Sequence, residues 1–150
     1  KGQIHYAVSE AKGLEGLRDE LIEQLQALAA MPAEERETVL LIVPHMLRDF
    51  LDFNDFLDEA DGVLQELDME GEFQVASFHP DFQFADTEPD DITNYTNRSP
   101  YPTLHLIREA SIDRAVEAFP QAEMIYEANM ATMEKLGHEG WKKLDVDATP

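Results

Sequence analysis

The fold is decided by the stretch Val39–Pro44, which reads VLLIVP. A continuous apolar run rich in β-branched residues predicts a central strand that is buried on both faces. Upstream, residues 3–8 alternate between two faces, which predicts a half-buried strand at the edge of a sheet with His5 facing outward. Downstream, Phe73–Phe78 predicts a third strand.

Two amphipathic helices separate these strands. Leucines recur at helical spacing from residue 14 to residue 28, and a second apolar stripe runs from Phe50 to Leu67. Strands that alternate with helices predict right-handed crossovers and a mainly parallel sheet. We therefore expect an α/β fold in a single domain, residues 1–142, with a small, mostly parallel sheet of three strands or slightly more packed with helices. Helix content should exceed strand content, and residues 143–150 should form a flexible C-terminal tail.

The composition is strongly acidic. The chain carries 32 acidic and 11 basic residues, which gives a net charge of −21. This charge repels nucleic acid and anionic membranes, and no apolar run is long enough to cross a bilayer. The chain has no cysteine, so disulfides and thiolate chemistry are excluded within it. We expect no nucleic-acid partner, no membrane association and a cytoplasmic location.

A long polar segment, residues 79–102, follows the third predicted strand. Loops of this length are uncommon in compact domains and are often functional. This one carries several aromatic side chains and four prolines, a composition that argues against disorder. Ligands of open α/β sheets bind beyond the carboxyl ends of the strands, where this segment begins. We therefore place the candidate site between residues 79 and 109.

The first kind of site that this segment could form is a metal centre. Pro102 suits the first turn of a helix, and a helix there places His105, Arg108 and Glu109 on one polar face. Imidazole and carboxylate groups are ligands for divalent metals. The candidate metal ligands are His79, Asp81, His105 and Glu109. Without a metal, His79, His105 and Asp81 are the candidate catalytic residues, as acid/base and orienting groups.

The second kind of site is a pocket for a small anionic molecule. Arg98 and Arg108 can each offer bidentate hydrogen bonds to a carboxylate or a phosphate. Neutral donors and an aromatic wall are supplied by Asn94, Asn97 and Tyr101. In a chain this acidic, Arg98 could instead pair with a neighbouring aspartate and pin the loop.

Three blocks of residues carry a resemblance to a known family. They are Ala76–Ala85, Asp90–Pro102 and Leu104–Ser111. Together they closely resemble the bacterial family catalogued as domain of unknown function 1415, and the similarity covers nearly the whole chain. The resemblance implies a small cytoplasmic bacterial protein in which the loop has a family-specific role, without assigning a catalytic residue. The family pattern includes an upstream Cys-Pro-Phe segment, so we expect further sequence before Lys1.

The sequence therefore predicts an enzyme or a binder of a small anionic molecule, with its site under residues 79–109 and a divalent metal left open as a cofactor. The alternative is a non-catalytic protein-interaction module whose ordered, aromatic and proline-rich loop is the docking surface. Geometry separates the two. Convergence of His79, His105 and Arg108 favours chemistry, whereas side chains that point apart or pin the loop favour the module.

Overall fold

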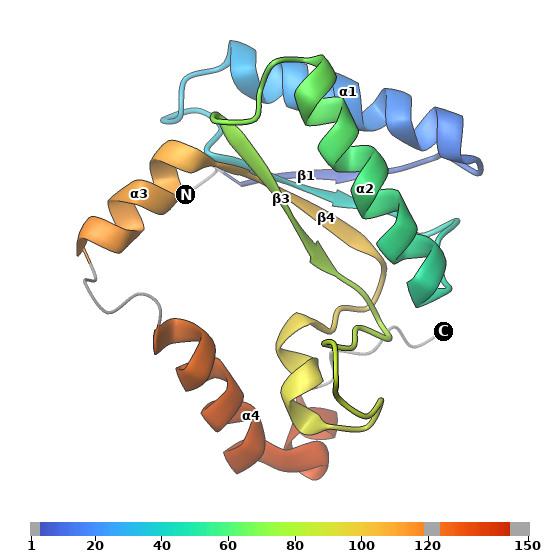
Figure 1. The fold of residues 1–150 in the computed structure, drawn as a ribbon, viewed down its shortest axis with the longest axis vertical. Coiled ribbons are helices and arrows are strands. Elements are labelled where there is room, and N and C mark those ends of the chain that lie inside the picture. Colours follow the sequence, from blue (N-terminus) through green and yellow to red (C-terminus); the bar gives the residue numbers. More distant parts are fainter. Residues whose placement is uncertain (1–3, 119–123, 145–150) are drawn as a thin grey trace.

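A four-stranded sheet forms the centre of the computed structural model, which describes residues 4–118 and 124–144 (Figure 1). Its strands are β1 Ile4–Val8, β2 Thr38–Ile42, β3 Phe73–Phe78 and β4 Thr103–Arg108. Their spatial order is β1-β2-β4-β3. β1 is parallel to β2, and β4 is antiparallel to both of its neighbours. The protein is thus α/β with more helix than strand, as the sequence predicts.

The sheet is mixed and has four strands, so the prediction of a mostly parallel three-stranded sheet is wrong on this point. The strand not predicted is β4, whose residues are predicted to be helical. Its residues also alternate with period two, and pairing on both sides decides in favour of the strand, because β2 and β3 together satisfy its backbone groups. β1 does lie at an edge, as predicted.

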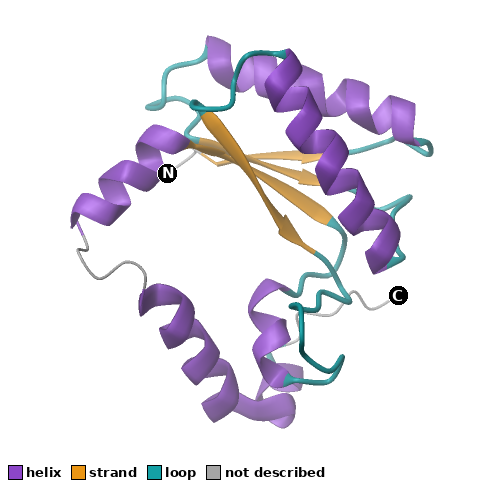
Figure 2. Ribbon diagram, viewed as in Figure 1, coloured by secondary structure: helices purple, strands orange, loops and turns teal. Residues whose placement is uncertain are grey.

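Two helices cover one face of the sheet, as Figures 1 and 2 show. α1 Leu14–Ala30 connects β1 to β2, and α2 Phe50–Glu66 connects β2 to β3. Asp49 caps α2, because its side chain accepts from the backbone N–H of Leu51 at 2.9 Å. The core between helices and sheet includes Leu17, Leu21, Leu25, Leu28, Val39, Leu41, Phe53, Leu104 and Leu106. The two predicted amphipathic helices are therefore present, and their apolar stripes form this core.

The opposite face of the sheet, which we call the open face, has no helix lying against it in the described chain (Figure 1). Ile4, Tyr6 and Val8 of β1 are 48%, 62% and 58% exposed on this side. Half-buried residues of the neighbouring strands continue the surface with Leu40, Ile42, Phe78 and Ile107. His5 is paired with the buried Val39 and faces the helices, so its predicted outward position is wrong.

The chain continues after β4 into α3 Glu109–Ala118 and then α4 Met124–Lys143. α4 is interrupted at Gly137, whose φ of 68° and ψ of 175° lie outside the helical region. A positive φ is accessible to glycine without steric cost. The turn after Gly137 packs on η1, a 3-10 helix over Ile92–Asn97.

Beyond Leu144, the predicted tail 143–150 lies outside the described residues. Within the described residues, no helix has both the length and the apolar character that a membrane span requires.

Candidate functional site

His79 follows β3 directly and is fully buried. Its Nε2 lies 2.8 Å from the carbonyl oxygen of Leu47, and its Nδ1 accepts from the backbone N–H of Asp81 at 2.9 Å. Because a carbonyl oxygen only accepts, Nε2 carries the proton. Because Nδ1 itself accepts a hydrogen bond, it carries no proton, and the ring is neutral. Burial lowers the pKa of His79, although the hydrogen bond to Leu47 acts in the opposite direction. Both ring nitrogens are engaged, which leaves neither for a metal or for proton transfer.

Two asparagines brace the loop from within. Asn94 is fully buried, and its Oδ1 accepts from the backbone N–H of Phe84 at 2.8 Å. Its Nδ2 donates to the carbonyl oxygen of Glu88, also at 2.8 Å. Asn97 Nδ2 donates to the carbonyl oxygen of Ser77 at 3.0 Å. Both amides thus satisfy backbone groups that an irregular loop would otherwise leave unpaired.

Arg98 pins the same loop through carbonyl oxygens. Its Nε donates to Phe82 at 2.8 Å and its Nη2 donates to Pro89 at 2.9 Å. The guanidinium carbon lies 4.3 Å from the centroid of the Tyr95 ring, a cation–π contact. The acceptors are backbone groups rather than the neighbouring aspartates that the sequence suggests. Arg98 is therefore held in one place, with its flat side on an aromatic ring.

Arg108 lies at the other end of β4 from the loop and closes the C-terminal end of α1. Its Nη2 donates to the carbonyl oxygens of Leu28, Met31 and Arg36 at 2.8, 2.9 and 2.8 Å. Carbonyl groups in the last turn of a helix have no partner within the helix, and a cation there also complements the helix dipole. Arg108 therefore has a structural position remote from the loop.

His79 and His105 are not brought together. His105 stands between Leu104 and Leu106, whose side chains are in the core, so strand alternation turns its ring to the open face. His79 instead packs against Phe53 of α2, with ring centroids 4.9 Å apart, on the covered side. Because β4 is a strand, the helical face predicted to join His105, Arg108 and Glu109 does not exist.

The predicted metal ligands are also separated. Asp81 lies beside His79, whereas Glu109 begins α3 and its backbone N–H donates to Glu72 at 2.8 Å. Among the described residues, no group of three or more His, Asp or Glu side chains is arranged to hold a metal ion. Burial lowers the pKa of His105. Its ring lies beside that of Phe78, with ring centroids 6.2 Å apart.

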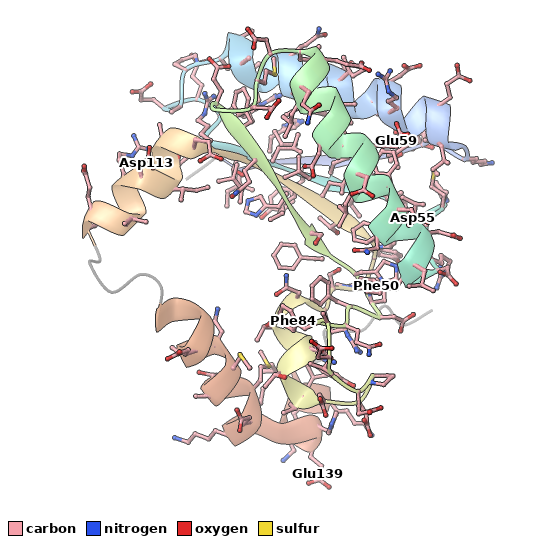
Figure 3. The ribbon with its side chains drawn as sticks, in the orientation of Figure 1. Phe50, Asp55, Glu59, Phe84, Asp113 and Glu139 are labelled. Atoms are coloured by element: carbon pink, nitrogen blue, oxygen red, sulfur yellow. The ribbon has the colours of Figure 1, made fainter. Side chains whose placement is uncertain are left out.

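A small pocket, which we call the loop pocket, lies between the loop and the end of α4. Its volume is about 230 Å³. Its lining residues are Pro80, Asp81, Tyr95, Arg98, His138, Trp141 and Lys142. Tyr95 makes edge-to-face contacts with His138 and Trp141, each with ring centroids 5.1 Å apart. In Figure 3, the Glu139 label marks this end of α4, below the segment that carries Phe84.

Cationic groups outnumber carboxylates in the loop pocket, the reverse of the chain as a whole. Arg98 and Lys142 are the cations, and Asp81 is the carboxylate, among the described lining residues. Within the described residues, Nη1 of Arg98 has no hydrogen-bond acceptor, whereas Nε and Nη2 are both used. A fixed guanidinium with a free donor, in a pocket that a lysine also lines, can bind carboxylate or phosphate oxygens.

Arg98 and Asp81 are predictable from the sequence, but the α4 side of the loop pocket is not. His138, Trp141 and Lys142 are more than thirty residues away in sequence, and no spacing rule connects them to the loop. One feature of the sequence does point to this side of the pocket. A lone tryptophan after Gly137 needs other side chains to pack against, and Trp141 is indeed only 6% exposed. Tyr101, predicted as a wall of the site, is 41% exposed and lies outside the lining.

The fold and the pocket together define an α/β protein with a mixed four-stranded sheet, one open face and a cation-rich pocket beneath an ordered loop. Residues 1–143 match the family described as "Protein of unknown function (DUF1415)", and the chain belongs to this family. The resemblance seen in the sequence is thereby confirmed. Neither a curated protein nor a solved structure matches the chain.

Proposed function

We propose that this protein binds a small molecule with a carboxylate or phosphate group in the loop pocket. One observation carries the proposal: Arg98 and Lys142 both line one hollow in a chain whose net charge is −21. Such a surface repels anions in general, so a local cationic hollow gives selectivity as well as attraction. The volume of about 230 Å³ is below the roughly 300–1,000 Å³ of typical ligand pockets, which favours a ligand of few atoms.

Binding is favoured over catalysis because the predicted acid and base groups are engaged elsewhere. His79 uses both ring nitrogens inside the fold, and His105 faces the open side of the sheet. The predicted alternative, a protein-interaction module, has support in the loop that Asn94 and Arg98 brace from within. It becomes the better explanation if the loop pocket takes no anion.

The chain has a single tryptophan, Trp141, so its fluorescence reports on the loop pocket directly. We expect inorganic phosphate, titrated at constant ionic strength, to change this emission saturably, and malonate to do so if carboxylates are accepted. Lys142→Glu replaces attraction by repulsion and should weaken binding about tenfold or more. Lys143→Glu makes the same charge change on a residue outside the lining and should leave the affinity unchanged.

Three outcomes would contradict the proposal. Chloride could give the same emission change as phosphate at equal ionic strength, which would indicate a general salt effect. Lys142→Glu and Lys143→Glu could weaken binding equally, which would indicate long-range charge alone. Emission that responds to neither phosphate nor malonate would favour the interaction module. Circular dichroism of both variants checks that the fold is retained.

A further inference from the structure

A second cavity lies at the carboxyl ends of β1 and β2, apart from the loop pocket. Its volume is about 580 Å³, within the range of roughly 300–1,000 Å³ that ligand pockets occupy. It is bounded by the segment that joins β1 to α1, by the segment that joins β2 to α2, and by the first half of α2. The carboxyl ends of strands are where ligands bind in open α/β sheets. We call this cavity the α2 groove.

One side of the α2 groove is apolar. It is formed by Leu14, Met46, Leu47 and Phe56. Phe56 is only 2% exposed and forms the base, whereas Leu14 is 56% exposed at the margin. Leu47 is fixed by the hydrogen bond that its carbonyl oxygen accepts from His79, and Met46 and Leu47 both pack on the core. The apolar side is therefore a preformed surface that an aliphatic chain could cover.

The other side of the α2 groove is a row of carboxylates. Asp52, Asp55 and Glu59 lie at positions i, i+3 and i+7 of α2, so they share one helical face. The helical rise separates them by about 4.5 Å and about 6 Å along the axis. Figure 3 labels Asp55 and Glu59 on the flank of α2 that adjoins the beginning of α1. The negative charges thus form a line beside the apolar surface.

These carboxylates are available for a ligand. The ion pairs of the described residues are Arg18–Glu66 and Arg114–Glu37, and neither includes a member of the row. Lys12 is the basic residue among the described residues of the lining, so the groove keeps a net negative charge. A ligand with complementary charge would need positive groups at intervals along an apolar body.

We propose that the α2 groove binds an aliphatic polyamine, independently of the anion site. Ammonium groups would pair with Asp52, Asp55 and Glu59 through charge-assisted hydrogen bonds, and the methylene chain would cover Phe56 and Met46. A bare divalent cation fits less well. Calcium and magnesium require oxygen ligands that converge on one point, whereas these carboxylates are spread along a helix and form no metal-holding group.

The test is calorimetric titration of the full chain with spermidine at physiological ionic strength. We expect saturable binding, and we expect Asp55→Asn to weaken it about tenfold. Asp58→Asn is the matched control, because Asp58 is exposed on the same helix, makes the same charge change and does not line the groove. It should leave the affinity within a factor of about two. Thermal unfolding of both variants checks that neither has lost the fold.

Three results would overturn the proposal. If Asp55→Asn and Asp58→Asn weaken spermidine binding equally, the attraction comes from the net charge of the chain alone. If Mg²⁺ at equal ionic strength displaces spermidine as effectively as a second polyamine, the apolar side contributes nothing. Absence of any saturable heat with spermidine also overturns it. Because Lys142→Glu does not touch this groove, the anion and polyamine sites can fail separately.

Discussion

The same four strands form both faces of the sheet, but the side chains on one face are buried and many of those on the other are exposed. Under α1 and α2, Leu104 and Leu106 are completely buried, and Arg108 reaches three carbonyl oxygens. On the open face, Tyr6 is 62% exposed and His105 lies between the core leucines without a helix over it. Most of the packing energy therefore comes from the face that α1 and α2 cover, whereas the open face contributes little.

The largest expected effect compares neighbours on β4. Leu106→Ala removes a fully buried side chain from the covered face and should lower the free energy of unfolding by about 2–5 kcal/mol. Ile107→Ala removes a half-buried side chain from the open face and should cost about 1 kcal/mol. Urea denaturation measures both values. Equal losses would mean that the open face is packed as firmly as the covered one.

A smaller effect compares two arginines. Arg108→Met keeps the apolar stem and removes the bonds to the Leu28 and Met31 carbonyl groups at the end of α1, so we expect the free energy of unfolding to fall by about 2–3 kcal/mol. Arg114→Met removes an exposed ion pair with Glu37 and should cost less than about 0.5 kcal/mol. Thermal unfolding of the two variants measures both losses of stability. Faster amide exchange confined to the last turn of α1 in Arg108→Met would locate the effect, and uniform exchange would speak against it.

The smallest expected effect concerns pH. Burial lowers the pKa of His79 on the covered side and of His105 on the open side. Each therefore binds a proton more readily in the unfolded chain, so the stability it confers is complete above an unfolded pKa of about 6.5 and declines as the pH falls toward the folded pKa. His105→Gln should flatten the decline in the free energy of unfolding between about pH 7.5 and about pH 5.5. If the free energy of unfolding of His105→Gln falls with pH as steeply as that of the wild-type chain, His105 makes no such contribution.

Most of the fold follows from local patterns in the sequence. The alternating edge strand, the two leucine- and phenylalanine-rich helices and the strand Phe73–Phe78 all have periodicities that one window reveals. β4 was missed because Leu104 and Ile107 suit a helix as well as a strand, and only pairing with β2 and β3 decides between them. Likewise, the alternation in β1 shows which residues share a face of the strand, but it does not show which face the helices cover.

The candidate site was predictable only as a region. Polar residues do gather between residues 79 and 109, but Asn94, Arg98 and Arg108 mostly satisfy backbone carbonyl groups. A sequence shows that such groups exist and not where the carbonyls that need them will lie. The contribution of Lys142 depends on how α4 returns to the loop, which is a tertiary feature.

The bonds of Arg108 also bear on the order of folding. Leu28 and Arg108 are 80 positions apart. The Arg108 guanidinium is nevertheless a partner of the Leu28 carbonyl oxygen, beside the backbone N–H of Met31, and it also donates to the Met31 carbonyl oxygen. A segment comprising only β1, α1 and β2 would lack that partner and the central neighbour of β2. The N-terminal half should therefore remain loosely packed during synthesis until β4 pairs with β2. That pairing joins residues far apart in the sequence, and it should therefore form slowly.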